Sequence, residues 1–142
     1  MKIAVFYNLD FGGAKRVIFE QIKGLKNSGN VIDLYTVNYE KDIFDPKLFC
    51  DNIYEFKINL SSSFPIIHRL ISDYKNFFVL KKLHKKIAKE IDSKNYDIVL
   101  VHPDKYTQSP FLLQFMKTKS AYYCQEPLRI AYEYTFRIRG EI

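Results

Sequence analysis

The chain has 142 residues, of which 47% are hydrophobic and 16% aromatic; this is enough for one buried core and too few for two ordinary domains. Its formal net charge of +6 comes from 22 Lys and Arg against 16 Asp and Glu, so its surface attracts phosphates, nucleic acid or anionic lipid. No apolar run approaches the roughly 20 residues of a membrane span and the start lacks a signal-peptide pattern, so we expect a cytoplasmic protein with a single domain over residues 1–142.

The first part of the chain predicts strands separated by a helix. Residues 2–8 form an apolar run, which is typical of a strand covered on both faces of its sheet. Helical spacing follows and ends near Gly29, because glycine suits a left-handed helix cap. Further strands are predicted at residues 31–37 and 53–58.

The second part continues the alternation. Apolar residues recur at helical spacing over residues 66–94, which predicts one helix or two joined by a kink. A strand is expected at residues 97–102, and Pro103 is expected to end it. A helix at residues 107–116 and a strand at residues 120–124 follow.

Strands that alternate with helices pair in parallel through right-handed crossovers. We therefore predict an α/β fold, a Rossmann-like doubly wound parallel sheet with strand order 3-2-1-4-5. Ligands of such sheets bind at the carboxyl ends of the strands, near the point where the strand order reverses. Residues that follow three separate strands meet at this edge: Gly12, Gly13, His102, Gln125, Glu126 and Pro127.

The glycine pair Gly12-Gly13 lies between the first strand and the first helix. Glycines permit a tight turn and close approach of a ligand, and the free N–H groups of a helix start favour an anion such as phosphate. An ordinary turn is the alternative. A GxGxxG loop is absent and the second strand does not end in an acidic residue, so neither a nicotinamide nor a flavin cofactor is expected. Cys50 and Cys124 lack CxxC spacing, so no metal site is expected either.

His102 and Glu126 are the candidate chemical groups. His102 ends a buried strand, where it can orient a ligand hydroxyl or accept a proton, or else cap a loop carbonyl. Pro127 favours extended geometry at Glu126, which would hold this carboxylate towards the crevice; the alternative is an ordinary exposed loop residue. Asp104 and Lys105 are interpreted as solvated loop charges.

The excess of positive charge is local. Between Arg69 and Lys89, Asp73 is the only acidic residue. This stretch could lie on an anionic membrane surface, or it could be the solvated face of a helix that covers the sheet. Nucleic acid is not expected as a partner, because the aromatic residues lie on the apolar stripe instead of between the lysines. The basic residues are Lys75, Lys81, Lys82, Lys85, Lys86 and Lys89, with His68 and His84.

Three motifs in order resemble the N-terminal half of family 4 glycosyltransferases, which are retaining, nucleotide-sugar-dependent enzymes with two Rossmann-like domains in the GT-B arrangement. The first is Lys-Ile-Ala-Val followed by Gly-Gly-Ala-Lys-Arg, the second Tyr-Asp-Ile-Val-Leu-Val-His, and the third Tyr-Tyr-Cys-Gln-Glu-Pro-Leu-Arg. They span residues 2–129, almost the whole chain.

The resemblance implies roles for the residues at the carboxyl edge. Gly12 and Gly13 would contact the donor diphosphate through their backbone, with Arg16 as a supporting charge. Gln125 and Pro127 would line the acceptor side. His102 and Glu126 would be the catalytic candidates, although which of them lies nearer the reacting carbon stays open.

One departure from the family is large. The donor-binding C-terminal domain with its E-x7-E motif is absent from these residues, so the chain alone is not expected to transfer sugar. The resemblance implies a cytoplasmic half-enzyme that needs a partner domain, a nucleotide sugar as substrate and a glycan or lipid-linked acceptor. The alternative is a non-catalytic module that binds a partner or the inner face of the membrane through the lysine-rich helix.

Overall fold

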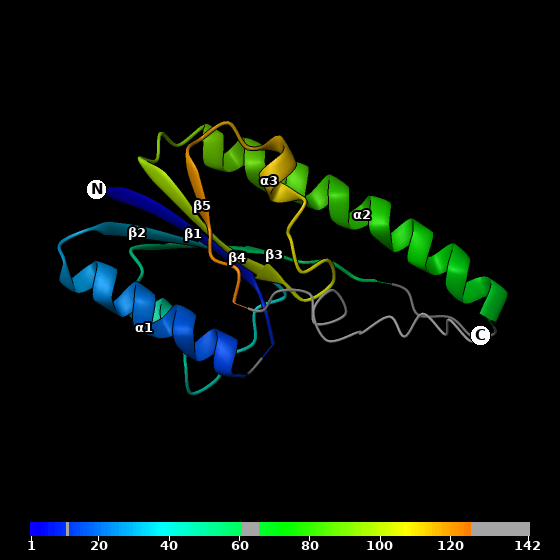
Figure 1. Cartoon of the computed structure of the whole chain (residues 1–142), viewed down its shortest axis with the longest axis horizontal. Coiled ribbons are helices and arrows are strands. Elements are labelled where there is room, and N and C mark those ends of the chain that lie inside the picture. Colours follow the sequence, from blue (N-terminus) through cyan, green and yellow to red (C-terminus); the bar gives the residue numbers. More distant parts are fainter. Residues whose placement is uncertain (11, 61–65, 126–142) are drawn as a thin grey trace, which may run out of the picture.

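A computed structural model describes residues 1–10, 12–60 and 66–125 of the chain (Figure 1). Five strands form one sheet in which every pair of neighbours is parallel, in the order β3-β2-β1-β4-β5. The predicted α/β class and strand order are therefore confirmed. The elements are β1 (Lys2–Asn8), α1 (Gly13–Asn27), β2 (Val31–Val37), η1 (Pro46–Phe49), β3 (Asn52–Phe56), α2 (Ile66–Asp92), β4 (Ile98–Asp104), α3 (Leu112–Phe115) and β5 (Ser120–Tyr122).

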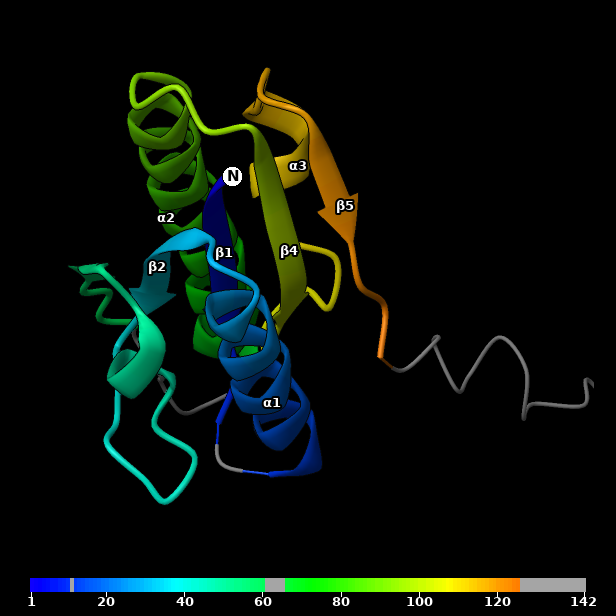
Figure 2. The ribbon, with the colours of Figure 1, turned by 90° about the vertical axis from the view of Figure 1, so that its left-hand side faces the viewer.

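The sheet is covered on both faces because the apolar residues of its central strands alternate between two cores. Val5 of β1 belongs to a core with Ile18 and Ile22 of α1. Phe6, the next residue, belongs to a second core with Ile87 of α2. Successive strand residues point to opposite faces, which places α1 on one side of the sheet and α2 on the other (Figure 1). Figure 2 shows β2, β1, β4 and β5 side by side in this order.

Three predicted boundaries agree closely with the structure. β1 covers the predicted residues 2–8 and β2 covers residues 31–37. The helix between them ends before Gly29, which has the positive φ of 79° expected of a left-handed cap. The long helical stretch forms a single helix, α2, of 27 residues.

The end of β4 differs from the prediction, because Pro103 does not stop the strand. Phe6 pairs with Val101 and Asn8 pairs with Asp104, so one residue of β1 lies opposite two residues of β4. This is a β-bulge, where a proline is tolerated since its ladder hydrogen bond is already lost. Because of this extra residue, the side chains of β4 after the bulge point to the face of the sheet opposite to the one that simple alternation predicts.

The segment after β4 also differs from the prediction. The expected helix at residues 107–116 is reduced to the four residues of α3. The backbone at Gln108 has a φ of 57°, and Asp104 and Gln108 exchange backbone hydrogen bonds of 3.0 and 2.7 Å, so a tight turn occupies the beginning of the predicted helix. β5 is shorter than the predicted 120–124 and ends at Tyr122. Among the described residues, no helix is both long and apolar enough to cross a bilayer.

Candidate functional site

The start of α1 is an uncapped helix terminus at the carboxyl edge of the sheet. Among the described residues, no side-chain hydrogen bond caps the helix start after Gly12, and the first turn carries no acidic residue. A Cβ atom added at Gly12 or at Gly13 would meet nothing within 4 Å. The N–H groups of this first turn and the positive end of the helix dipole are an arrangement that suits an anion.

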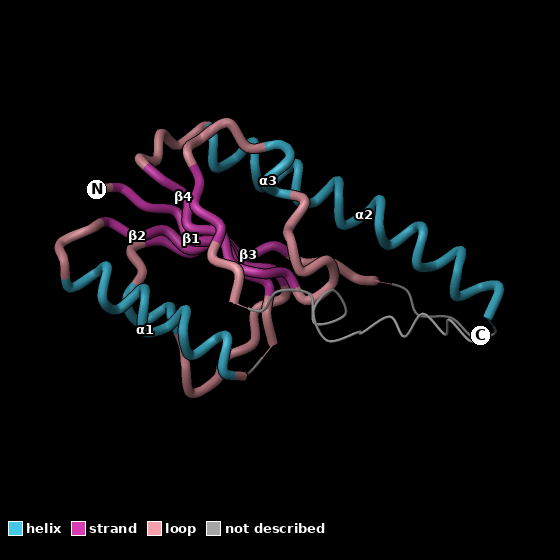
Figure 3. The backbone as a smooth tube through the Cα atoms, viewed as in Figure 1, coloured by secondary structure: helices cyan, strands magenta, loops and turns pink. Residues whose placement is uncertain are grey.

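Figure 3 shows the loops that follow β1 and β4 on the side of the sheet where α1 begins. This is the edge at which a doubly wound sheet binds its ligands, next to the reversal of strand order between β1 and β4.

His102 lies before the bulge of β4 and is fully buried. Its Nδ1 lies 3.3 Å from Nε2 of Gln125, and the same Nε2 lies 3.3 Å from the backbone oxygen of Ala14. Because a carbonyl oxygen can only accept, the Gln125 atom between them is the amide nitrogen, which donates one proton to Ala14 and one to His102. The segment after β5, the end of β4 and the first turn of α1 therefore meet, as the sequence predicts for this edge.

The bond from Gln125 determines the state of the His102 ring. Nδ1 accepts, so the ring proton of the neutral form lies on Nε2. This Nε2–H is buried and has no hydrogen-bond partner among the described residues. Burial lowers the pKa of His102 to about 4, so the ring is neutral near pH 7. Of the roles predicted for His102, a neutral ring that donates a hydrogen bond from Nε2 to orient a ligand hydroxyl fits this pKa.

We expect His102 to remain neutral, with its proton on Nε2, from pH 8 down to about pH 5, because its pKa is lowered to about 4. The unfolded ring has a pKa of about 6.5. The contribution of this neutral ring to stability is thus present above that value and is lost as the pH falls from about 6.5 towards 4. Long-range ¹H–¹⁵N spectra of the imidazole check both statements. In Gln125→Leu the tautomer preference should be lost; an unchanged spectrum would contradict the assigned bond.

The other predicted site residues lie in different settings. Arg16 is exposed, and its guanidinium carbon lies 5.8 Å from the ring centre of Phe44, so it points to the segment after β2. Glu126 and Pro127 lie outside the described residues, so the proximity of Glu126 to His102 stays a prediction.

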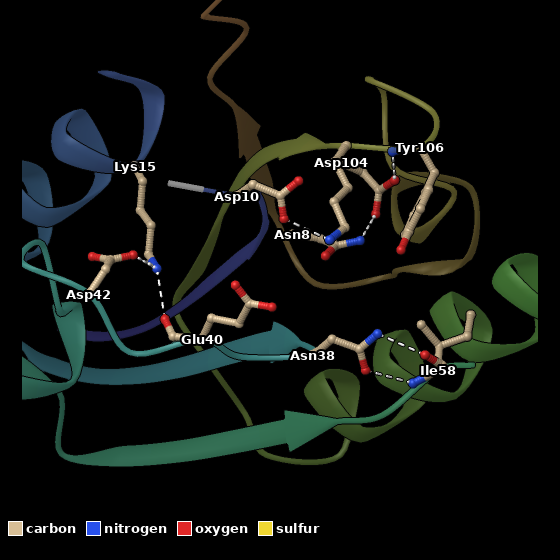
Figure 4. Close-up of polar contacts among 10 residues, drawn as sticks. Asn8, Asp10, Lys15, Asn38, Glu40, Asp42, Ile58, Asp104 and Tyr106 are labelled. Atoms are coloured by element: carbon tan, nitrogen blue, oxygen red, sulfur yellow. Dashed lines mark hydrogen bonds and ion pairs between the residues drawn. The ribbon is translucent and has the colours of Figure 1, made fainter. Parts of the chain in front are cut away.

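Lys15 is a site residue that sequence reasoning missed. It lies in the first turn of α1, yet it is only 2% exposed. Its ammonium forms an ion pair with Asp42 and donates to the backbone oxygen of Glu40 at 3.0 Å (Figure 4). These bonds join the beginning of α1 to the segment after β2. Nothing in the helical spacing could indicate this, since the partners are 25 and 27 residues away.

A second missed group lies beneath this edge. Asp104, which the sequence suggested was a solvated loop charge, is buried on β4 and accepts from Nδ2 of Asn8 at 2.7 Å (Figure 4). Its carboxylate also accepts from the backbone N–H groups of Tyr106 at 2.8 Å and Thr107 at 3.1 Å. Nε2 of the buried His84 on α2 lies 3.4 Å from it. The bulge explains this position, because it turns Asp104 towards α2 while His102 contacts the side of α1.

These contacts decide the ionisation of Asp104. Burial alone raises the pKa of its carboxyl, but the close contact with the His84 ring and the hydrogen bonds from Asn8 and Tyr106 outweigh burial, so the pKa is below its usual range. A charged carboxylate thus ties together β1, β4 and α2 below the site. Lys105, the next residue, is exposed as predicted and pairs with Asp10 after β1 at 2.7 Å.

A polar pocket adjoins the site at the carboxyl ends of β1 and β2. Its walls carry groups of both charge signs, which suits a ligand with many hydroxyl groups better than an apolar one. No set of three or more His, Cys, Asp or Glu side chains suited to a metal ion occurs in the part of the chain that the structure describes. Its polar and charged lining residues include Asp10, Lys15, Asn38, Glu40, Asp42 and Lys105.

The chain was compared with known proteins through family models and curated sequences. No family model and no curated protein matches it. The fold and the contacts of its own residues therefore carry the functional proposal.

Proposed function

We propose that this chain is the acceptor-side domain of a retaining glycosyltransferase of the GT-B arrangement, which acts together with a second, donor-binding domain on the same or another polypeptide. The single observation that supports this most is the contact of Gln125 with both Ala14 and His102 at 3.3 Å. This contact brings together one residue from each of the three motifs that resemble the glycosyltransferase family, beside the start of α1. The Rossmann-like sheet supports the same proposal.

The reaction would transfer a sugar from a nucleotide diphosphate sugar to an acceptor hydroxyl, with release of the nucleoside diphosphate. The bond from the anomeric carbon to the diphosphate breaks, and the departing oxygens gain negative charge. The free N–H groups at the start of α1 would stabilise this charge, with the exposed Arg16 adding a positive charge at the same end of α1.

His102 would act as a neutral donor. Its ring is held by Gln125, and its buried Nε2–H, which has no partner among the described residues, would donate to an oxygen of the sugar or the phosphate. In this proposal Gln125 is a positioning residue, because it acts through the ring of His102. Glu126 is proposed as the second chemical group on the acceptor side, with Pro127 beside it. Asp10 and Glu40, which line the small polar pocket, would accept hydrogen bonds from hydroxyl groups at one edge of the acceptor.

The proposal predicts an anion site at the start of α1. In ¹H–¹⁵N spectra of the chain, titration with a nucleoside diphosphate sugar, and with inorganic pyrophosphate, should shift the amides from Gly12 to Lys15 in a saturable way. Gly13→Val should weaken this binding at least about tenfold, because a branched side chain in the first turn would crowd an anion that approaches these N–H groups. No sugar transfer is expected from the chain alone, since half of the cleft that positions the reactants would be missing.

A matched control is Gly24→Ala in the last turn of α1. A Cβ atom there also meets nothing within 4 Å. This variant should gain about 0.5 to 1 kcal/mol in the free energy of unfolding and bind pyrophosphate as the parent chain does. Shifts that avoid α1, or equal binding by Gly13→Val, would contradict the proposed site. Turnover of donor by the isolated chain would contradict the need for a second domain.

A further inference from the structure

Helix α2 consists of two unequal parts. From Leu80 onwards it packs on the sheet, with Leu80 at 3% and His84 and Ile87 at 0% exposure. The part from Leu70 to Val79 extends beyond the end of the sheet (Figure 1). In this projecting part Ser72 is buried and Asn76 half-buried, and every other residue is exposed.

The projecting part carries an exposed apolar patch. Soluble proteins rarely expose large hydrophobic side chains in such a cluster, and a cluster of this kind marks an interaction surface. Tyr74 and Phe78 contact each other with ring centres 4.7 Å apart, and Phe77 contacts Phe78 at 5.7 Å. The patch consists of Leu70, Ile71, Tyr74, Phe77, Phe78 and Val79, which are between 45% and 67% exposed.

The lysines of α2 continue the same face of the helix. Leu70, Tyr74 and Phe78 are followed at spacings of three and four residues by Lys81, Lys85 and Lys89. Residues at these spacings lie one above the other on a helix. One line along α2 therefore changes from apolar and aromatic side chains to lysines, starting at Lys81.

The lysines also border a groove between α2 and the chain that follows β3. Its floor includes Ile58, Val79 and Leu83, and its rim is basic. Asn38 fixes this floor, because its side chain bonds the backbone N–H and oxygen of Ile58 at 2.9 and 2.7 Å (Figure 4). None of the rim lysines pairs with a carboxylate of the described residues. The rim lysines are Lys57, Lys82, Lys85, Lys86 and Lys89.

We propose that α2 docks this protein on a lipid bilayer that carries anionic headgroups. The apolar patch would enter the interface, where aromatic side chains are favourable, while the lysines and the basic groove bind headgroup phosphates. An anionic bilayer fits because the apolar patch and the lysines lie along one face of α2. Lysines alone would suit any polyanion, and an apolar patch alone would suit any hydrophobic surface. The proposal does not depend on the glycosyltransferase assignment.

Flotation with vesicles tests this docking. The chain should bind vesicles of phosphatidylcholine with about a third of phosphatidylglycerol at low salt and remain unbound with pure phosphatidylcholine. Raising the salt from about 0.1 to 0.5 M should weaken binding at least about tenfold, because the Debye length falls well below 10 Å. Tyr74→Ser with Phe78→Ser should weaken binding by a similar factor; both side chains are at least half exposed, so the fold should persist.

Two triple variants distinguish the contribution of the groove lysines to vesicle binding from the contribution of the net charge of the chain. Lys82→Gln, Lys85→Gln and Lys86→Gln together should lower vesicle binding at least about tenfold. Lys23→Gln, Lys117→Gln and Lys119→Gln remove the same charge from exposed lysines outside α2 and should leave binding nearly unchanged. The proposal would be overturned by equal binding to neutral vesicles, by equal loss in both triple variants, or by binding to soluble polyphosphate or RNA without binding to vesicles.

Discussion

Asp104→Ala is expected to cost about 3 to 5 kcal/mol of unfolding free energy, which is a large share of the stability of a domain of this size. Its carboxylate bonds the Asn8 amide and two backbone N–H groups, and it lies 3.4 Å from Nε2 of His84. Alanine would leave these groups buried without an acceptor. Urea unfolding followed by circular dichroism measures the loss.

The control is Asp10→Asn. Asp10 is also an acidic residue beside the same edge, but its side chain is 69% exposed, so the change should cost less than about 1 kcal/mol. If both variants lost the same stability, the buried carboxylate would have no special role.

The same carboxylate should make stability depend on pH. Its pKa in the folded chain is lowered beneath the value of about 3.9 found in unfolded chains. The stabilising contribution is therefore fully present above about pH 4 and is lost as the pH falls through the lower, folded value. Asp104→Asn should flatten the decline in unfolding free energy over that acidic range, and an unchanged decline would contradict the assignment.

Ile87→Ala is expected to have the second large effect, a loss of about 2 to 5 kcal/mol. Ile87 is fully buried in the core between α2 and the sheet, so its truncation leaves a cavity in a packed interior. Thermal and urea unfolding measure the change.

Phe78→Ala in the same helix is the matched comparison. Phe78 is 50% exposed in the projecting part, so its removal should change stability by less than about 1 kcal/mol. A loss as large as that of Ile87→Ala would show that the projecting part of α2 is packed against something, and would contradict the exposed patch on which membrane docking rests.

The sequence predicts most of the fold because the central strands are uninterrupted apolar runs. Residues 2–8 and 31–37 match β1 and β2 at both ends, and the alternation with helices determines the parallel order. The predictions fail where a single contact decides the local structure. The turn after β4 is held by the carboxylate of Asp104, and its bonds to Tyr106 and Thr107 replace the first turn of the predicted helix.

The site could be predicted only in outline. Topology alone brings Gly13, His102 and Gln125 to one edge, and the contacts of Gln125 agree with that prediction. The burial of Asp104 could not be predicted, because it depends on a bulge of one residue at Pro103. The depressed pKa of His102 could not be predicted either, because it depends on how completely neighbouring segments cover the ring. Lys15 was missed because helical periodicity describes which face a residue occupies and not the loop that covers it.

The ion pair of Lys15 has a mechanical consequence. Its ammonium binds Asp42 and the carbonyl of Glu40, so the first turn of α1 and the segment at residues 40–42 are tied together directly. A displacement of that turn would therefore pull on residues that line the neighbouring polar pocket.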